Sequence, residues 1–417
     1  MALLGFFMQV VLFLLFPIVV TLVLMDWKYP RKKRMLGKAF FNVLMLVVVE
    51  LLALAGALFF IFDLHAGIFM SCVIAFGGLI GIYLTLLLWK RKWKVVKIVL
   101  FILMIACLAT FFSVKAYQYY VDQLPTVGEW DGIIYEYQPF EENTKAVTLE
   151  EESIFKIEDN LPVLDGATAL YPVYASLAQN VYPSNDSYPP SQPPVQCKKT
   201  PQAYEQLTQG QVDMIFVAEP SRKQLEAAAA SGVEFQMTPI GKEAFVFFVN
   251  KDNPVDSLTL EQIQGIYNGT YTNWKELGGK NQKIQAFQRD EGSGSQTALQ
   301  KIMGGQEMIS PVMTKEVGGL GGLIEKVGDY KNYSNAIGFS FRFYSTEMVK
   351  NDEIKLVKIN GVAPTEENIR NGSYPISSYF YAITAGSQNP NIQPFLDWIL
   401  SEQGQEIIEK VGYTPMQ

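Results

Sequence analysis

The first quarter of the chain is a series of long apolar runs separated by short polar loops. Each run has about 20 residues, which is enough for a helix to cross roughly 30 Å of hydrocarbon. The four runs are Leu3–Met25, Phe40–Phe62, Gly67–Trp89 and Val95–Val114. The pattern therefore predicts a four-helix transmembrane region over residues 1–115. We expect the first run to be retained rather than cleaved as a signal peptide, because no basic residue precedes Lys28 and three more runs follow.

Basic residues are distributed unevenly over the loops between these runs. Lys and Arg cluster at residues 28–38 and 90–94, whereas the loop 63–66 contains neither. The positive-inside rule places both basic loops in the cytoplasm, so the N-terminus and everything after the fourth run lie outside. We therefore expect a multi-pass protein of the cell membrane, embedded in the lipid bilayer, with its second part on the extracytoplasmic side.

Two polar features of this first part stay open. Glu50 is the one carboxylate inside the apolar runs, and it is either a proton or ion site or a hydrogen-bonded residue buried between helices. Residues 116–160 form a predicted connector that is rich in glutamate. The connector is either an acidic stalk or a polar loop that leads into the first strand of the next domain.

From about Leu161 the hydrophobic pattern changes to that of an α/β domain, which we expect over residues 161–417. Short β-rich segments alternate with amphipathic stretches. The expected strands include 213–217, 244–249 and 336–339, and the expected helices include 174–180, 223–230, 259–265, 296–303 and 392–410.

Charge and composition exclude several functions for this second part. The whole chain has a net charge of −7, but the first 115 residues have 12 basic and 3 acidic side chains. The remainder therefore carries a net charge of −16, which argues against nucleic-acid binding. The only histidine is His65, and Cys197 is the only cysteine after residue 115. A Ser–His–Asp triad and a Cys- or His-based metal site are thus excluded there, and we expect neither an enzyme nor a metal or cofactor.

The most informative stretch is Q-R-D-E-G-S-G-S-Q-T at residues 288–297. Its glycines let the backbone approach a ligand closely, and the Ser/Gly run leads into an expected helix. The first amides of a helix lack internal partners and carry the positive end of the helix dipole, so this turn suits an oxyanion. Arg289 would add a cationic fork. The alternative is a helix start that only caps itself.

Glu291 in this stretch bears on which anion would bind. A carboxylate accepts a hydrogen bond only from a protonated oxyanion, so Glu291 would favour phosphate over sulfate if it faced the ligand. Alternatively, Glu291 only orients Arg289. The two hypotheses differ in whether Glu291→Gln narrows the selectivity or weakens both anions together.

Two further turns have the same chemistry. Gly166 and Thr168 follow a short apolar strand and open a helix, and the strand at 213–217 ends in the turn Glu219–Pro220–Ser221 before another helix. Three strand-to-helix turns of one kind suggest one anion bound at the carboxyl ends of strands.

Several segments together resemble the phosphate-binding protein of bacterial high-affinity phosphate ABC transporters. The resemblance covers roughly Leu161–Gln417 and does not extend to the apolar runs. It rests on D-G-A-T-A-L-Y-P-V-Y (165–174), V-D-M-I-F-V-A-E-P-S (212–221), R-D-E-G-S-G-S-Q-T (289–297), G-V-A-P-T-E-E-N-I (361–369), Y-P-I-S (374–377), F-L-D-W-I-L-S-E-Q-G-Q (395–405) and G-Y-T-P (412–415).

The resemblance implies a type II periplasmic-binding-protein fold, in which two α/β lobes joined by two crossover strands close on a dehydrated oxyanion. Carried over position by position, it implies the ligand residues Thr168, Ala169, Arg289, Glu291, Ser293, Gly294 and Ser295. The family's second Ser-rich turn is replaced here by V-Q-C-K-K-T, where Thr200 could serve. The family's aspartate after the V-D strand has no clear match, and Glu219 and Ser221 are the nearby candidates.

The hypothesis that follows is a membrane-anchored extracytoplasmic protein that binds inorganic phosphate and presents it to the permease subunits of an ABC transporter. The alternative is a sensor or adaptor that uses the same binding fold and signals through a partner membrane protein, since no output domain is visible in the sequence.

Overall fold

The computed structural model describes residues 16–23, 32–59, 66–90, 92–124, 126–127, 132–184, 193–317, 323–327, 330–349 and 352–416. The chain divides into two compact units. The first contains the described residues up to Gln123 together with Lys315–Lys326, and the second contains Leu124–Thr314 and Val327–Gln417.

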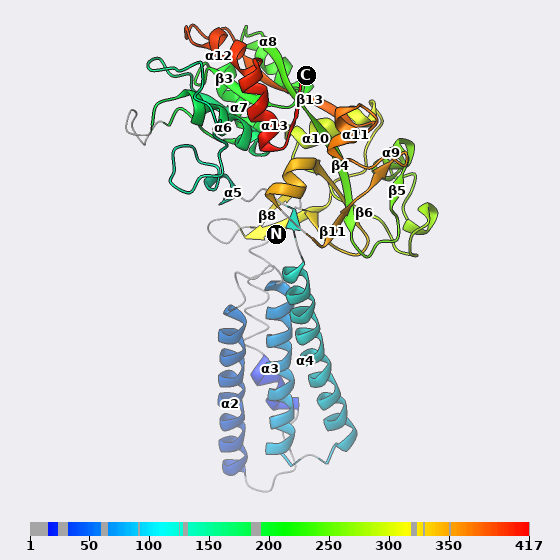
Figure 1. Ribbon diagram of the computed structural model, residues 1–417. Helices are drawn as coiled ribbons and strands as arrows, with labels where there is room; N and C mark the ends of the chain where they lie inside the picture. Colours follow the sequence, from blue (N-terminus) through cyan, green and yellow to red (C-terminus); the bar gives the residue numbers. More distant parts are fainter. Residues whose placement is uncertain are drawn as a thin grey trace. The chain divides into compact units, whose positions relative to one another are not determined.

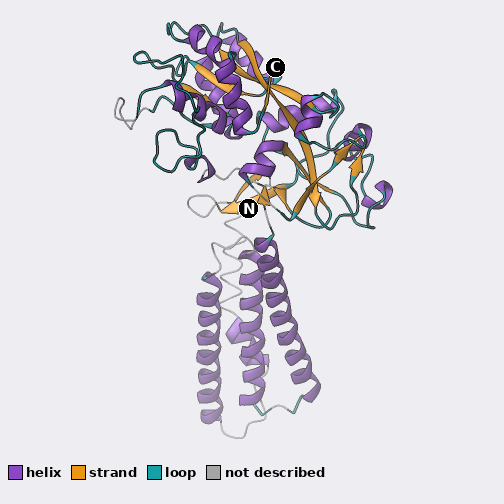
Figure 2. Ribbon diagram, in the orientation of Figure 1, coloured by secondary structure: helices purple, strands orange, loops and turns teal. Residues whose placement is uncertain are grey.

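Long helices make up the first unit (Figures 1 and 2). They are α2 (Lys32–Leu58), α3 (Ala66–Leu88) and α4 (Lys94–Gln123). Three segments in them, Met35–Leu58, Ile68–Leu88 and Lys94–Gln123, are long and apolar enough to cross a membrane. These segments correspond to the second, third and fourth predicted runs. Of the first predicted run, residues 16–23 are helical and the rest lies outside the described residues.

Helices α2 and α3 pack closely through small residues. A Cβ atom added to Gly77 would lie 2.5 Å from Ala53 Cβ, and one added to Gly81 would lie 2.7 Å from Leu46 Cδ2. Small residues at such crossings let helix backbones approach, which is a common way to pack helices in a bilayer. We infer that larger side chains at either glycine would force these two helices apart.

Helix α4 is longer than the apolar pattern indicates. It continues past Val114 to Gln123, so the predicted connector boundary at residue 116 falls inside a helix. The reason is local: residues 115–123 contain no glycine or proline, and the next helix breaker in the sequence is Pro125.

The acidic segment before the α/β domain is packed and is not a free stalk. Its backbone is held by helix α6 (Tyr171–Val181), because Val147 N–H donates to Ser176 Oγ at 2.8 Å and Leu149 N–H donates to Asn180 Oδ1 at 2.9 Å. The Leu149 side chain is buried, while the glutamates 150–152 are exposed. The alternation of exposed acids with buried apolar residues explains why composition alone indicated a stalk.

One eight-stranded mixed sheet organises the second unit. Its strands run in the order β2-β3-β13-β4-β10-β6, and β11 and β14 also pair with β4. These strands are β2 (Leu164–Gly166), β3 (Met214–Val217), β4 (Gln236–Asn250), β6 (Gln285–Ala286), β10 (Ala336–Phe341), β11 (Ile354–Leu356), β13 (Ser377–Thr384) and β14 (Thr414–Pro415). The shorter pairs are β1 (Thr126–Val127) with β9 (Tyr330–Lys331), β5 (Ser257–Leu258) with β12 (Lys358–Ile359), and β7 (Met313–Val317) with β8 (Leu323–Val327).

Strands β4 and β13 carry the chain between two lobes. The first half of β4 pairs with β13, and its second half pairs with β10 and β11. Strand β13 also pairs with β3, and its pairings with β3 and with β4 are both antiparallel. This arrangement matches the expected pair of crossover strands between two α/β lobes.

Each lobe surrounds its part of the sheet with helices. Lobe 1 contains α6, α7 (Lys199–Thr208), α8 (Arg222–Ala230), α12 (Ile392–Ile399) and α13 (Glu402–Val411). Lobe 2 contains α9 (Leu260–Tyr267), α10 (Gly294–Met303) and α11 (Glu366–Arg370). Short elements elsewhere are α5 (Gly132–Tyr135), the 3₁₀ turns η1 (Thr168–Leu170) and η3 (Trp274–Leu277), and the π-helical turn η5 (Tyr344–Met348). The sheet packs on Tyr174 and Phe395 in lobe 1 and on Ile263 and Leu299 in lobe 2.

The helix expected over residues 392–410 is wrong in one respect, because two helices meet there at Leu400 and Ser401. Ser401 Oγ donates to Trp398 O at 2.7 Å, and Gln405 Nε2 donates to Ile399 O at 3.0 Å. A Cβ atom at Gly404 would lie 2.4 Å from Ile399 O, so the bend needs glycine at that position. The apolar periodicity on both sides of the bend hides it from sequence inspection.

We expect a fragment of residues 124–417 to be soluble without detergent. All the predicted and observed apolar spans precede residue 124, and the remaining chain has its own buried core. Expression followed by fractionation and size-exclusion chromatography measures this. Recovery of the fragment only with membranes would show that the boundary is misplaced.

Candidate functional site

A pocket in the α/β domain brings most of the predicted ligand residues together. It has a cavity volume of about 60 Å³. One water molecule needs at least about 10–15 Å³ of such volume, so the cavity suits a group of a few heavy atoms. The predicted residues that line it are Thr168, Ala169, Thr200, Arg289, Ser293, Gly294 and Ser295.

Three helix starts converge on this pocket. Thr168 begins the turn η1 that leads into α6, Thr200 lies in the first turn of α7, and Ser293 is the N-cap of α10. The first amides of each helix have no acceptor within the helix, and the helix dipole adds partial positive charge there. The pocket therefore combines backbone donors, hydroxyl groups and Arg289, which together suit a small oxyanion.

The start of α10 is fixed by side chains of its own sequence motif. Ser293 Oγ accepts a hydrogen bond from Gln296 N–H at 3.3 Å, so the hydroxyl does cap the helix. Gln296 Oε1 accepts from Arg289 N–H at 2.9 Å, and this bond ties the arginine backbone to the helix start. A Cβ atom at Gly294 would lie 3.5 Å from Thr200 Oγ1, so α10 and α7 approach each other at this glycine.

Three predicted residues, Glu219, Ser221 and Glu291, lie outside the pocket lining. Glu291 is 61% exposed and pairs with Lys223 at 2.7 Å. Glu219 pairs with Lys301 at 2.7 Å and accepts from Tyr381 OH at 3.2 Å. Both ion pairs link lobe 1 to lobe 2. An ionised carboxylate is more stable in such solvated pairs than beside an anion pocket, which accounts for both positions.

Ser221 has a structural role in the same region. It is the N-cap of α8, and its Oγ accepts from Gln224 N–H at 3.3 Å. The turn before α8, which the sequence suggested as the third anion-binding turn, contributes only Ala218 to the pocket. The start of α7 lines the pocket instead, through Thr200. Helix α7 was not predicted, although Ala203, Tyr204 and Leu207 form a buried face at helical spacing.

We expect Glu291→Gln to leave phosphate affinity within about twofold of wild type. The carboxylate faces solvent, and an exposed ion pair is worth only about 0–1 kcal/mol. Calorimetric titration of the variant with phosphate and with sulfate measures this. A selective loss of phosphate binding would show that Glu291 contacts the bound anion.

Polar residues that the sequence did not single out also line the pocket. Among them are Glu243, Ser340, Ser378 and Tyr413. The available signal for Glu243 was a lone carboxylate directly before the apolar strand segment 244–249. No comparable pattern marks the two serines or Tyr413.

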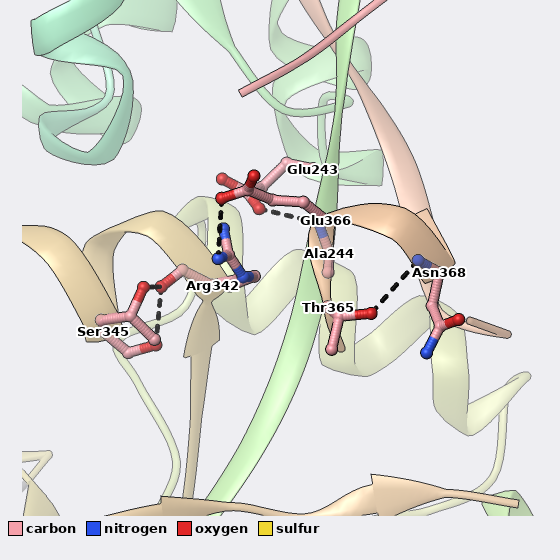
Figure 3. A network of polar contacts seen from close by, with 8 residues as sticks. Glu243, Ala244, Arg342, Ser345, Thr365, Glu366 and Asn368 are labelled. Atoms are coloured by element: carbon pink, nitrogen blue, oxygen red, sulfur yellow. Dashed lines mark hydrogen bonds and ion pairs between the residues drawn. The ribbon is translucent and has the colours of Figure 1, made fainter. Parts of the chain in front are cut away.

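Glu243 is the one carboxylate among the residues that line this pocket. It is 6% exposed, and its carboxylate accepts from the Ala244 N–H at 2.8 Å through Oε1. Oε2 is buried and has no hydrogen-bond partner within the described part of the chain. Burial raises the pKa of Glu243 to about 8, and the Ala244 amide, the charge of Arg342 and the Phe343 amide offset only part of that effect. Figure 3 shows Glu243 beside Arg342, which pairs with Glu366 at 3.1 Å.

Metal chemistry has no evident site in the described part of the chain. No group of three or more His, Cys, Asp or Glu side chains is placed there to hold a metal ion. The pocket itself offers hydroxyls, amides, an arginine and one buried acid, a donor set for an anion and not for a cation.

A family profile described as a PBP superfamily domain matches residues 162–403 of the chain. That stretch includes the pocket residues from Thr168 to Ser378 and ends inside α13. It excludes the membrane-type helices of the first unit.

Individual relatives match the same part of the chain. The phosphate-binding protein PstS of Bacillus subtilis is 27% identical over 259 residues, which are 61% of this chain and 80% of that protein. The phosphate-binding protein PstS of Pseudomonas aeruginosa is 28% identical over 197 residues, covering 43% of this chain and 59% of that protein. A solved substrate-binding protein with bound phosphate from Clostridium perfringens is 25% identical with a TM-score of 0.46, and the match covers 61% of this chain and 98% of that one.

Proposed function

The chain belongs to the PBP superfamily, and from this premise we propose that its α/β domain binds inorganic phosphate in the pocket where the helix starts converge. The family consists of binding proteins, which confirms the prediction that the chain is not an enzyme. The two bacterial relatives are phosphate-binding proteins by name, which supports phosphate as the ligand, and the donors that line the pocket support it independently.

The observation that carries the proposal is the convergence of Arg289 with the starts of α6, α7 and α10 in one pocket. The net charge of −16 beyond residue 115 repels anions at long range, so affinity has to come from these local groups. Hydrogen bonds to a charged ligand are worth about 1.5–3 kcal/mol each, so a few such contacts are enough for tight binding.

The membrane part of the proposal rests on the apolar helices. Three of them are long and apolar enough to span a bilayer, and a fourth span at Leu3–Met25 stays a prediction because most of it lies outside the described residues. We propose that these helices hold the binding domain at the extracytoplasmic face, where it presents phosphate to the permease subunits of an ABC transporter. The pattern of basic loops supports this orientation.

Titration calorimetry of the detergent-solubilised chain with phosphate, sulfate and molybdate tests the ligand. We expect saturable binding of one phosphate per chain and at least tenfold weaker binding of the other two anions. Tighter binding of sulfate or molybdate would show that phosphate is not the preferred ligand. If none of the three anions gave a heat of binding, the proposed oxyanion site would be refuted.

Protease protection tests the orientation. We expect protease added to intact cells, with the outer membrane made permeable where one is present, to remove residues 124–417 while the spans stay in the membrane. The physical reason is the positive-inside rule, which predicts both basic loops on the cytoplasmic side. If the domain were degraded only after the cytoplasmic membrane was lysed, the predicted topology would be inverted.

A further inference from the structure

Glu243 lies at the pocket, but the proposed function assigns it no role in binding. It lies on β4 where this strand crosses between the lobes, directly opposite Ser378 of β13. Because Oε1 is occupied by the Ala244 N–H, Oε2 is the oxygen left to meet a ligand. Glu243 and Arg289 line the same pocket, so a bound anion would contact a fixed positive charge and this buried acid together.

The charges around Glu243 leave its own charge largely uncompensated. The charge of Arg342 acts on Glu243, but its guanidinium is already paired with Glu366 of α11 at 3.1 Å. Lys242, the neighbour on β4, instead lies over the Tyr379 ring at 5.6 Å. The other titratable groups on the pocket wall are Arg289, Tyr344, Tyr379 and Tyr413. Glu243 and Glu366 thus compete for the charge of Arg342, and Arg342 forms its ion pair with Glu366.

Tyr413 shows how closely this region is packed. Its hydroxyl donates to the Ala169 carbonyl oxygen at the start of α6, so the phenol is committed to a structural bond. Burial raises the pKa of Tyr413, and the neighbouring Glu243 raises it further. Tyr413 therefore stays neutral over the pH range in which Glu243 titrates, and it supplies no compensating charge.

We propose that Glu243 determines how the pocket holds its anion: as a neutral acid, it donates its Oε2–H to an oxygen of the bound oxyanion, and affinity falls when this carboxyl ionises. The inference rests on the proposed function, since phosphate is the anion used to test it. It replaces the expected acceptor role of Glu291 with a donor role for a different residue.

The protonation state of Glu243 determines whether it attracts or repels an anion in the pocket. A neutral carboxyl group places a hydrogen-bond donor against the anion without adding negative charge, whereas an ionised one would repel the ligand in a water-poor site. A bound anion also favours the protonated form of Glu243. By linkage, the protonated form must then favour the anion by the same factor.

The test is the phosphate affinity of the detergent-solubilised full chain, measured by calorimetry between pH 6 and pH 9.5 for wild type and Glu243→Gln. The amide is nearly isosteric, donates a hydrogen bond and carries no charge at any pH. The ratio of the two affinities at each pH cancels the titration of phosphate itself. Glu291→Gln is the matched control, because it removes a carboxylate outside the pocket lining.

We expect the two affinities to agree within about threefold at pH 6–7. Between pH 7 and pH 9.5, wild type should then lose about 30-fold relative to Glu243→Gln, as expected for one group with a pKa of about 8 whose ionised form does not bind. The Glu291→Gln control should follow the wild-type curve throughout.

Three results would overturn the inference, and each can be distinguished from the others. Normal phosphate binding by wild type, with a constant affinity ratio at every pH, would overturn the role of Glu243 and leave the proposed function intact. No phosphate binding by wild type at any pH would overturn the proposed function and the inference with it. A loss of tenfold or more in Glu243→Gln at pH 6 would show that Glu243 is an ionised acceptor, which also contradicts the donor role.

Discussion

Replacing Arg289 by alanine is expected to weaken phosphate binding by tenfold to more than a hundredfold. Arg289 is half-buried on the pocket wall, and its backbone is tied to the start of α10 through Gln296. A hydrogen bond between a guanidinium and an anion is worth about 1.5–3 kcal/mol, and each 1.4 kcal/mol corresponds to a factor of ten in affinity. Calorimetric titration with phosphate measures the loss.

Two variants sharpen this prediction. Arg289→Lys should recover only part of the affinity, because an ammonium group keeps the charge but cannot present the planar fork. Arg222→Ala is the matched control, since that side chain is 89% exposed and pairs with Glu226 on the surface of α8. Near-wild-type affinity in Arg289→Ala would place the anion site elsewhere in the domain.

The second large effect concerns stability in the absence of ligand. Glu243 keeps its proton in the folded chain up to a pKa of about 8, whereas its unfolded value is 4.5. Between these two values the unfolded state binds fewer protons, so stability falls as pH rises. At about 1.4 kcal/mol per pKa unit, wild type should lose roughly 5 kcal/mol over this range from this group alone.

Glu243→Gln has no proton to lose and should escape this penalty. We therefore expect the difference in unfolding free energy between the variant and wild type to grow from pH 4.5 to about pH 8 and then to level off. Urea unfolding followed by near-ultraviolet circular dichroism, repeated across this range, measures the difference. Parallel curves for the two proteins would show that Glu243 ionises normally in the folded state.

The contrast between Arg289 and Glu243 shows which part of the site the sequence could reveal. Arg289, Ser293, Gly294 and Ser295 lie within one short motif that opens a helix, so local chemistry and the family resemblance together could single them out, and all four line the pocket. The surroundings of Glu243 include Ser378, which lies opposite it on β13, and Arg342, whose charge acts on it, and both are distant in sequence. No local pattern encodes that environment.

In the fold, too, features that depend on one segment could be predicted, and features that depend on distant residues could not. Apolar runs predicted α2, α3 and α4, and short β-rich segments predicted β3 and β10, because each pattern reflects burial along a single element. The packed course of the segment around Val147 and Leu149 depends on Ser176 and Asn180 of α6, which the segment meets only in the folded chain. The positions of Glu219 and Glu291 outside the pocket lining have a similar cause, since their partners Lys301 and Lys223 belong to the opposite lobes.

A structure determined with arsenate, the heavier tetrahedral analogue of phosphate, tests the central claim most directly. Its anomalous signal locates the anion without reference to the surrounding density. We expect a single peak in the pocket, within hydrogen-bonding distance of Arg289, Thr168 and Ser295 and close to Glu243 Oε2. A peak at another place in the domain, or no peak at a concentration that saturates binding in solution, would contradict the assigned site.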